Sequence, residues 1–140
     1  MMKTSAGILI LYNHKALLAH STNSSWWKSY TPPKGGVEEG ETFEQTASRE
    51  VAEELGIAID PALLKERVDV EYRNAGGSKY KTVILFIHRI NTLSEISLET
   101  EHVPFSQLQK DEIDEAKFMD AIEIEKKVLP RYIDHIIPLL

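Results

Sequence analysis

The chain has 140 residues, 42% of them hydrophobic and 27% charged, a composition that fits one ordinary globular domain over residues 1–140. It contains no cysteine, which excludes a disulfide framework, a thiolate zinc site and a cysteine nucleophile and makes the cytoplasm the default location. The net charge of −6 repels phosphate backbones, so we expect no bulk binding to nucleic acid and only local capture of an anionic ligand.

Two apolar runs near the start of the chain predict a strand hairpin. Residues 6–12 and 15–21 are strand-like, and Asn13 and His14 supply turn chemistry between them. The first run is short for the core of a signal peptide and far short of the roughly 20 residues that cross a bilayer. We therefore expect no membrane segment.

A functional loop and a helix come next. Residues 21–41 are rich in Ser, Pro and Gly and show no core pattern, and a long loop inside a compact domain is often functional. A helix is predicted at 43–55, because Thr42 and Gln45 can form a capping box and Gly56 is the preferred left-handed terminator.

The end of this helix concentrates negative charge. Glu50 lies three and four residues before Glu53 and Glu54, so the carboxylates crowd one side of the helix. Like charges at these spacings destabilise a helix by roughly 0.2–0.5 kcal/mol per pair. The last turn also carries the negative end of the helix dipole, where anions are disfavoured. Something outside the helix must compensate this charge.

The middle of the chain predicts two further strands. Residues 66–74 alternate apolar and polar positions, as expected for a half-buried strand. Residues 80–90 form a continuous β-branched and aromatic run, which is typical of an interior strand.

The last fifty residues predict loop, strand and helix. Residues 91–111 have a weak pattern and are expected to be loop with a short helix near Pro104, followed by a strand at 115–120. Residues 121–140 are expected to be helical, with an interruption near Pro130. The order of elements indicates an α/β or α+β layered domain.

One motif spans the functional loop and the first helix. Gly35 is followed after five residues by Glu41, and after seven more by the run REVAEELG at 49–56. This pattern resembles the Nudix box at all of its defining positions. The resemblance implies a Nudix-type α/β/α sandwich with a mixed β-sheet, in which the box binds divalent cations against a substrate diphosphate.

The resemblance also implies the metal ligands. Glu53 and Glu54 match metal-binding glutamates, and Glu50 matches a position that binds metal or acts as general base; we assign Glu50 to the metal. Gly35 matches a residue whose carbonyl joins the metal shell, and the lack of a Cβ lets the loop approach the ion. The implied ion is Mg²⁺, with Mn²⁺ as a substitute, because hard cations prefer carboxylate oxygen and need few protein ligands.

Other positions of the box match supporting roles. The resemblance implies that Arg49 orients a neighbouring carboxylate and that Glu41 holds the loop to the helix. Glu112, six residues before Phe118, matches a distant glutamate and is our candidate for a further metal ligand or the general base. Glu115 is its competitor, and an ordinary solvated carboxylate is the alternative for either.

The flanks of the box suggest the substrate. The stretch TPPKGG at 31–36 and the stretch SKYKTVILF at 78–86 resemble the asymmetrically cleaving dinucleoside polyphosphate hydrolases, which act on diadenosine tetraphosphate. The implied reaction is metal-assisted hydrolysis of a phosphoanhydride bond, giving ATP and AMP. Alternatives are a nucleoside triphosphate or RNA 5′-end pyrophosphohydrolase and a non-catalytic nucleotide-sensing domain.

Several lysines and aromatic residues are candidates for contact with a small-molecule nucleotide. Lys34, Lys79 and Lys81 are candidates for the outer phosphates, although surface lysines at strand ends are also common. Tyr30 and Tyr80 are candidates for stacking on a purine. The two tryptophans in the functional loop either share that role or anchor the loop, and the five histidines show no metal-ligand spacing. The sequence predicts no oligomeric state.

Overall fold

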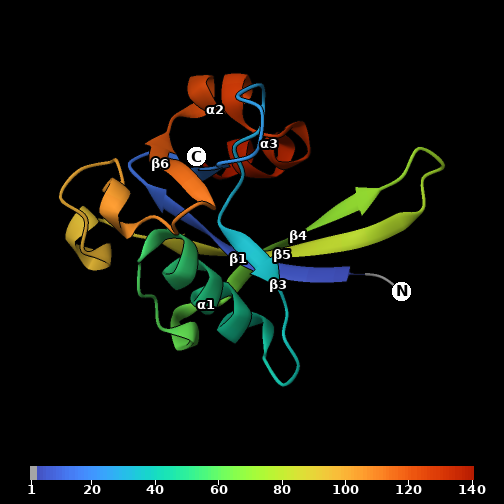
Figure 1. Ribbon diagram of the computed structural model, residues 1–140, viewed down its shortest axis with the longest axis horizontal. Coiled ribbons are helices and arrows are strands. Elements are labelled where there is room, and N and C mark those ends of the chain that lie inside the picture. Colours follow the sequence, from blue (N-terminus) through green and yellow to red (C-terminus); the bar gives the residue numbers. More distant parts are fainter. Residues whose placement is uncertain (1–2) are drawn as a thin grey trace.

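The computed structural model describes residues 3–140 (Figure 1). Within this range a sheet of six strands has the order β4-β5-β1-β2-β6, and β3 pairs with β1 outside this path. The strands are β1 (Lys3–Tyr12), β2 (Lys15–Ser21), β3 (Lys34–Gly36), β4 (Glu66–Arg73), β5 (Lys79–Arg89) and β6 (Ile113–Met119). The sheet is mixed, because β1 and β5 run parallel and the other pairs run antiparallel.

Helices cover both faces of the sheet, as Figure 1 shows with α1 on one side and α2 and α3 on the other. The helices are α1 (Phe43–Leu55), α2 (Ala121–Lys127) and α3 (Pro130–Ile136), with short 3-10 helices η1 (Pro61–Leu63), η2 (Leu93–Ile96), η3 (Phe105–Gln107) and η4 (Ile137–Leu139). No helix within residues 3–140 has the length and apolar character needed to cross a membrane. The predicted α/β/α sandwich with a mixed sheet is confirmed.

Strand alternation divides the core into two layers. Along β1, Ile8 and Ile10 pack in the cluster under α1, whereas Leu9 and Leu11 pack in the cluster under α2 and α3. Successive side chains of a strand point to opposite faces, so neighbouring residues serve different layers. This parity also decides on which side of the sheet each functional residue lies.

The predicted hairpin and first helix are confirmed at their predicted positions. Asn13 and His14 both adopt positive φ, at 49° and 60°, as a two-residue hairpin turn requires. At the start of α1, Thr42 and Gln45 form the capping box. Gly56 ends the helix at φ 65°, and the lack of a Cβ there lets Gln107 pack against it.

Three details of the fold differ from the sequence prediction. The strand β3 lies inside the segment expected to be loop, because its Gly-rich backbone pairs with β1 without any apolar pattern. The strand β6 begins at Ile113, two residues earlier than predicted, and its register with β2 shifts between His20 and Ser21. The helix η2 appears in a segment whose weak pattern gave no sign of it.

The close packing of β3 on β1 generates a stability prediction. A Cβ on Gly7 would lie 2.1 Å from the Pro33 carbonyl oxygen. This oxygen belongs to the backbone, so it can give way only if the chain around Pro33 shifts. We expect Gly7→Ala to lower the free energy of unfolding by at least about 2 kcal/mol in urea titrations. Gly76→Ala is the matched control, since its Cβ would meet only Asn74 Oδ1 at 3.4 Å, an ordinary contact. Equal stability of the two variants would contradict this view of the β1–β3 contact.

Candidate active site

Arg49 on α1 is the centre of a network between the helix and the preceding loop. Its Nε and Nη2 donate to the two carboxylate oxygens of Glu41 at 2.7 and 2.9 Å, and its Nη1 donates to Glu50 at 2.9 Å. The same Nη1 reaches Glu53 at 3.3 Å, and Nη2 donates to the Gly36 carbonyl at 3.1 Å. One planar fork therefore orients three carboxylates, as predicted for Arg49 and Glu41.

Glu41 receives further donors that hold the loop in place. The Glu38 backbone N–H and the Thr46 hydroxyl donate to its Oε1 at 3.0 and 2.8 Å. The hydrogen bonds from Arg49, and then that from Glu38, lower the pKa of Glu41 to about 2. Glu41 is therefore a fixed anion that fastens the loop to α1.

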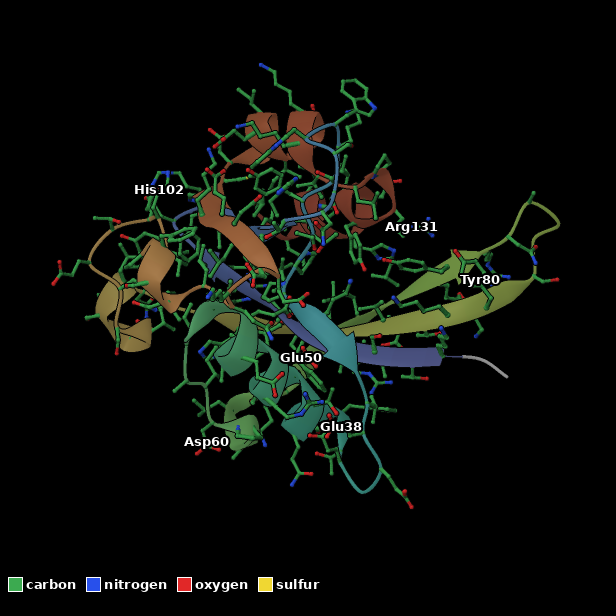
Figure 2. The ribbon with its side chains drawn as sticks, in the orientation of Figure 1. Glu38, Glu50, Asp60, Tyr80, His102 and Arg131 are labelled. Carbon is green, nitrogen blue, oxygen red and sulfur yellow. The ribbon has the colours of Figure 1, made fainter. Side chains whose placement is uncertain are left out.

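The side chains of Glu50 and Glu54 are half-buried, so their carboxylates are partly desolvated (Figure 2 labels Glu50). The Lys34 backbone N–H donates to Glu54 Oε2 at 2.9 Å. Burial, followed by the charge of Glu50, raises the pKa of Glu54 to about 8. Burial also raises the pKa of Glu50, and Arg49 opposes this shift. Perturbed carboxylates of this kind are typical of functional sites.

Gly35 makes room for the Glu50 carboxylate. A Cβ built on Gly35 would lie 2.1 Å from Glu50 Cδ and within 2.3 Å of both of its carboxylate oxygens. The backbone of β3 therefore approaches this carboxylate more closely than any other residue type would allow. Gly35 faces α1 because it pairs with Ala6, whose side chain lies in the α1 layer.

These groups fit a hard divalent cation. Among residues 3–140 no three His, Asp or Glu side chains already form a cluster that could hold a metal ion. Mg²⁺ needs only one or two protein carboxylates and keeps several waters, so Glu50 and Glu54 beside the Gly35 backbone suffice. A cation there would favour the ionised forms that burial now disfavours. Glu53 is more exposed and points to Arg49, so its metal role stays a prediction.

The loop before β6 docks on the end of α1. The Gln109 backbone N–H donates to the Glu54 carbonyl at 2.9 Å, and the Gln107 side chain donates to the Leu55 carbonyl at 3.2 Å. Glu112 follows in this loop, exposed, and its carbonyl accepts from the Thr22 N–H at 3.0 Å. The structure gives its carboxylate no ion pair within the described part of the chain, and its metal or base role stays a prediction.

Glu115 is occupied elsewhere. The Tyr30 hydroxyl donates to it, and Tyr30 belongs to the layer under α2 and α3, on the face of the sheet opposite α1. This contact separates Glu115 from the carboxylates of α1. The physical reason is strand parity in β6, which turns Glu115 toward the other layer.

The predicted aromatic residues have different surroundings. Tyr30 is only 2% exposed, so base stacking there does not fit the structure. Trp26 stacks on His20 with ring centroids 3.6 Å apart, and both Trp26 and Trp27 are largely exposed. Tyr80 is exposed and packs edge-on against Tyr72, so Tyr80 and the two tryptophans remain candidates for contact with a base.

The predicted phosphate-binding lysines differ in the groups that surround their ammonium. Lys79 forms an ion pair with Glu71 at 3.2 Å and shares this carboxylate with Arg73, so its charge is partly compensated. Lys81 lies 4.8 Å from the centre of the Tyr72 ring, and Arg131 of α3 lies 3.8 Å from the same ring. The sequence predicted no substrate contact for Arg131 or Tyr72, because no spacing along the chain connects α3 with β4.

A comparison with protein families identifies the architecture. The model of the NUDIX domain matches residues 1–140. The chain belongs to the Nudix family. Nudix hydrolases generally use divalent metals, in agreement with the oxygen-rich site on α1.

Curated relatives of this Nudix chain include the pig bis(5′-nucleosyl)-tetraphosphatase [asymmetrical]. The two are 38% identical over 84 residues, which cover 59% of this chain and 57% of the relative. The rat protein of the same name is 37% identical over 84 residues with the same coverage. The chain thus spans less than two thirds of the curated relatives that it matches.

Solved structures share the Nudix fold. A bifunctional NMN adenylyltransferase/ADP ribose pyrophosphatase from Francisella tularensis, complexed with AMP and a Mn ion, matches with a TM-score of 0.71 and 15% identity, over 99% of this chain and 41% of that one. The Ap4A hydrolase of C. elegans matches with a TM-score of 0.58 and 23% identity, over 88% and 83%. At these identities the likeness concerns the fold alone.

The contact between Gly35 and Glu50 generates a prediction about metal binding. Gly35→Ala forces the Glu50 carboxylate away, and we expect Mg²⁺ affinity to fall at least about tenfold by isothermal titration calorimetry. Gly36→Ala is the matched control, since a Cβ there meets nothing within 4 Å. Unchanged affinity of Gly35→Ala would contradict the placement of the metal beside Glu50.

The low pKa of Glu41 generates a prediction about acid stability. The folded pKa of about 2 lies below the ordinary value of 4.5, so the stabilisation by Glu41 is complete above pH 4.5 and is lost as the pH falls through 2. We expect Glu41→Gln to be less stable than the unmodified protein at pH 7 and to approach it toward pH 2. Urea titrations from pH 7 to 2 measure this, and a constant difference would refute it.

Proposed function

We propose that this Nudix domain is a Mg²⁺-dependent hydrolase of dinucleoside polyphosphates that splits diadenosine tetraphosphate into ATP and AMP. The observation that carries the proposal is the meeting of Glu50, Glu54 and the Cβ-free Gly35 backbone, oriented by Arg49. The sequence similarity to the asymmetrical tetraphosphatases supports the choice of substrate. The cytoplasm, expected from the composition, remains part of the proposal.

The residues of the chain have distinct tasks in this reaction. When bound, the metal supplies a Lewis acid for the diphosphate and lowers the pKa of a water. Glu50 and Glu54 hold the positive charge at the end of α1, and Arg49 keeps Glu50 in its rotamer. Glu112 is the candidate for removing the proton of the attacking water, since its loop is fastened to α1 through Gln109.

Neighbouring residues of β3 supply two kinds of group to the proposed substrate site. Gly35 faces α1 and the carboxylates, whereas Lys34 faces the α3 side, where its ammonium can meet phosphates next to the metal. Burial lowers the pKa of Lys34, and Glu54 and Glu50 oppose this shift. Tyr80, on the hairpin of β4 and β5, offers an exposed ring to a base (Figure 2).

Product analysis tests the proposal. Diadenosine tetraphosphate and a panel of nucleoside triphosphates are incubated with Mg²⁺ and the protein, and the products are separated by ion-exchange chromatography. We expect ATP and AMP, abolished by EDTA and reduced at least about 100-fold in Glu54→Gln, which removes a metal ligand. Glu44→Gln, on the first turn of the same helix, is the matched control and should retain full activity.

The other outcomes separate the competing functions. Release of pyrophosphate from triphosphates, without cleavage of diadenosine tetraphosphate, would favour a triphosphate or RNA 5′-end pyrophosphohydrolase. Binding of Mg²⁺ and nucleotide without any turnover would favour a sensing domain. Activity that survives in Glu54→Gln would contradict the proposed site itself.

A further inference from the structure

Positively charged side chains gather on the α3 side of the sheet. Lys3 and Lys81 are direct neighbours across the parallel pair β1–β5. Lys81 lies two residues before Val83, whose side chain packs in the layer under α2 and α3, so strand parity puts Lys81 on that face. Lys34 crosses Gly7 on the same face, because a Gly7 Cβ would lie 2.7 Å from Lys34 Cβ.

Arg131 completes this arrangement from α3, the helix that covers this face of the sheet. Its guanidinium carbon lies 3.8 Å from the centre of the Tyr72 ring, and Lys81 Nζ lies 4.8 Å from the same centre. Tyr72 and Lys81 are register partners in β4 and β5. Figure 2 shows Arg131 on α3, on the side toward the hairpin that carries Tyr80. We call Lys3, Lys81 and Arg131 the cationic face.

The cationic face carries charges that no ion pair among residues 3–140 compensates. Most other basic side chains form ion pairs within 4.0 Å, such as Arg73 with Glu71, but in the described part of the chain none of the three does so. The pKa of Lys81 is lowered by burial and then by the charges of Lys34, Lys3 and Arg131. Like charges held together without an anion raise the free energy of the free protein. An anionic ligand would remove this cost.

Lys34 connects the cationic face with the candidate active site. Its backbone N–H donates to the Glu54 carboxylate, while its side chain lies on the side of Lys81. The charges of Glu54 and Glu50 act on the Lys34 ammonium, and the charge of Lys34 acts on Lys81 together with those of Lys3 and Arg131. Lys34 therefore links the carboxylates of α1 with the cationic face, and a polyphosphate held at the carboxylates could extend past Lys34 toward Lys81 and Arg131.

We propose that Arg131 is a specificity-determining residue that binds, together with Lys3 and Lys81, the phosphates of a polyphosphate chain beyond the metal-bound pair. The planar guanidinium suits this task, because it can donate two parallel hydrogen bonds to one phosphate while its face remains on Tyr72. The inference rests on the proposed function for the identity of the ligand. It predicts a preference for four phosphates over three.

The first experiment measures anion binding without metal or turnover. Inorganic tripolyphosphate is titrated into the protein in EDTA at low salt, with isothermal titration calorimetry. We expect Arg131→Gln and Lys81→Gln each to weaken binding at least about tenfold, since each removes a charge-assisted contact, and Arg131→Lys to keep part of it. Arg89→Gln is the matched control at the other end of β5, with its charge already paired to Glu66, and should change binding less than about twofold.

The variants also separate binding from packing. If Arg131→Gln weakened binding and Lys81→Gln did not, Arg131 would act only through the packing of α3 on Tyr72, and the proposal would be overturned. Unchanged binding in both variants would overturn it as well. These results do not depend on hydrolysis, so a loss of tripolyphosphate binding without any cleavage of diadenosine tetraphosphate would refute the proposed function and leave the cationic face supported.

The second experiment measures selection by chain length. With Mg²⁺ present, we expect Arg131→Gln to raise KM for diadenosine tetraphosphate about tenfold while kcat and the KM for diadenosine triphosphate stay within about twofold. A parallel loss for both substrates would overturn the assignment of Arg131 to the outer phosphates.

Discussion

The organisation of the site depends on the ion pairs of Arg49. Without them, a mobile loop and a helix with crowded negative charge would meet in many arrangements. The guanidinium bonds Glu41 of the loop and Glu50 of the helix at once, and its second Nη holds the Gly36 carbonyl. The low pKa of Glu41 shows that this anion is strongly stabilised by its donors. The network leaves Glu54 outside the fork, where burial rather than pairing decides its protonation.

The short strand β3 contributes residues of the site to both faces of the sheet. Its neighbouring residues Lys34 and Gly35 point to opposite layers because side chains alternate along a strand. Gly35 admits the Glu50 carboxylate on the α1 face, and Lys34 begins the cationic side on the α3 face. The two halves of a polyphosphate site, carboxylates for a metal and cations for phosphate, are thus separated by one residue of backbone. In the described part of the chain Lys34 forms no ion pair within 4.0 Å with these carboxylates, although its charge acts on Glu54.

Much of the local structure follows from the sequence alone. The capping residues and Gly56 predict α1 at its observed bounds, since both depend on contacts within a few residues. The β-branched run predicts β5 as an interior strand, and β4 and β1 do flank it. The strand β3 escaped prediction because backbone pairing, not apolar pattern, holds it on β1. Tyr30 was misjudged for a similar reason, because an aromatic residue in a polar loop gives no sign that it is buried.

What the sequence determined by itself was the chemistry of the box: which residues carry carboxylates, which carry the guanidinium, and how they are spaced on one helix. The tertiary structure decided which charges remain free. Lys79 is paired with Glu71, while Lys81 meets Arg131 at Tyr72. Arg131 reaches this position only because α3 folds back over the sheet from the end of the chain. Spacing along the chain describes contacts within an element, but pairing between elements depends on strand register and layer packing, which no local pattern records.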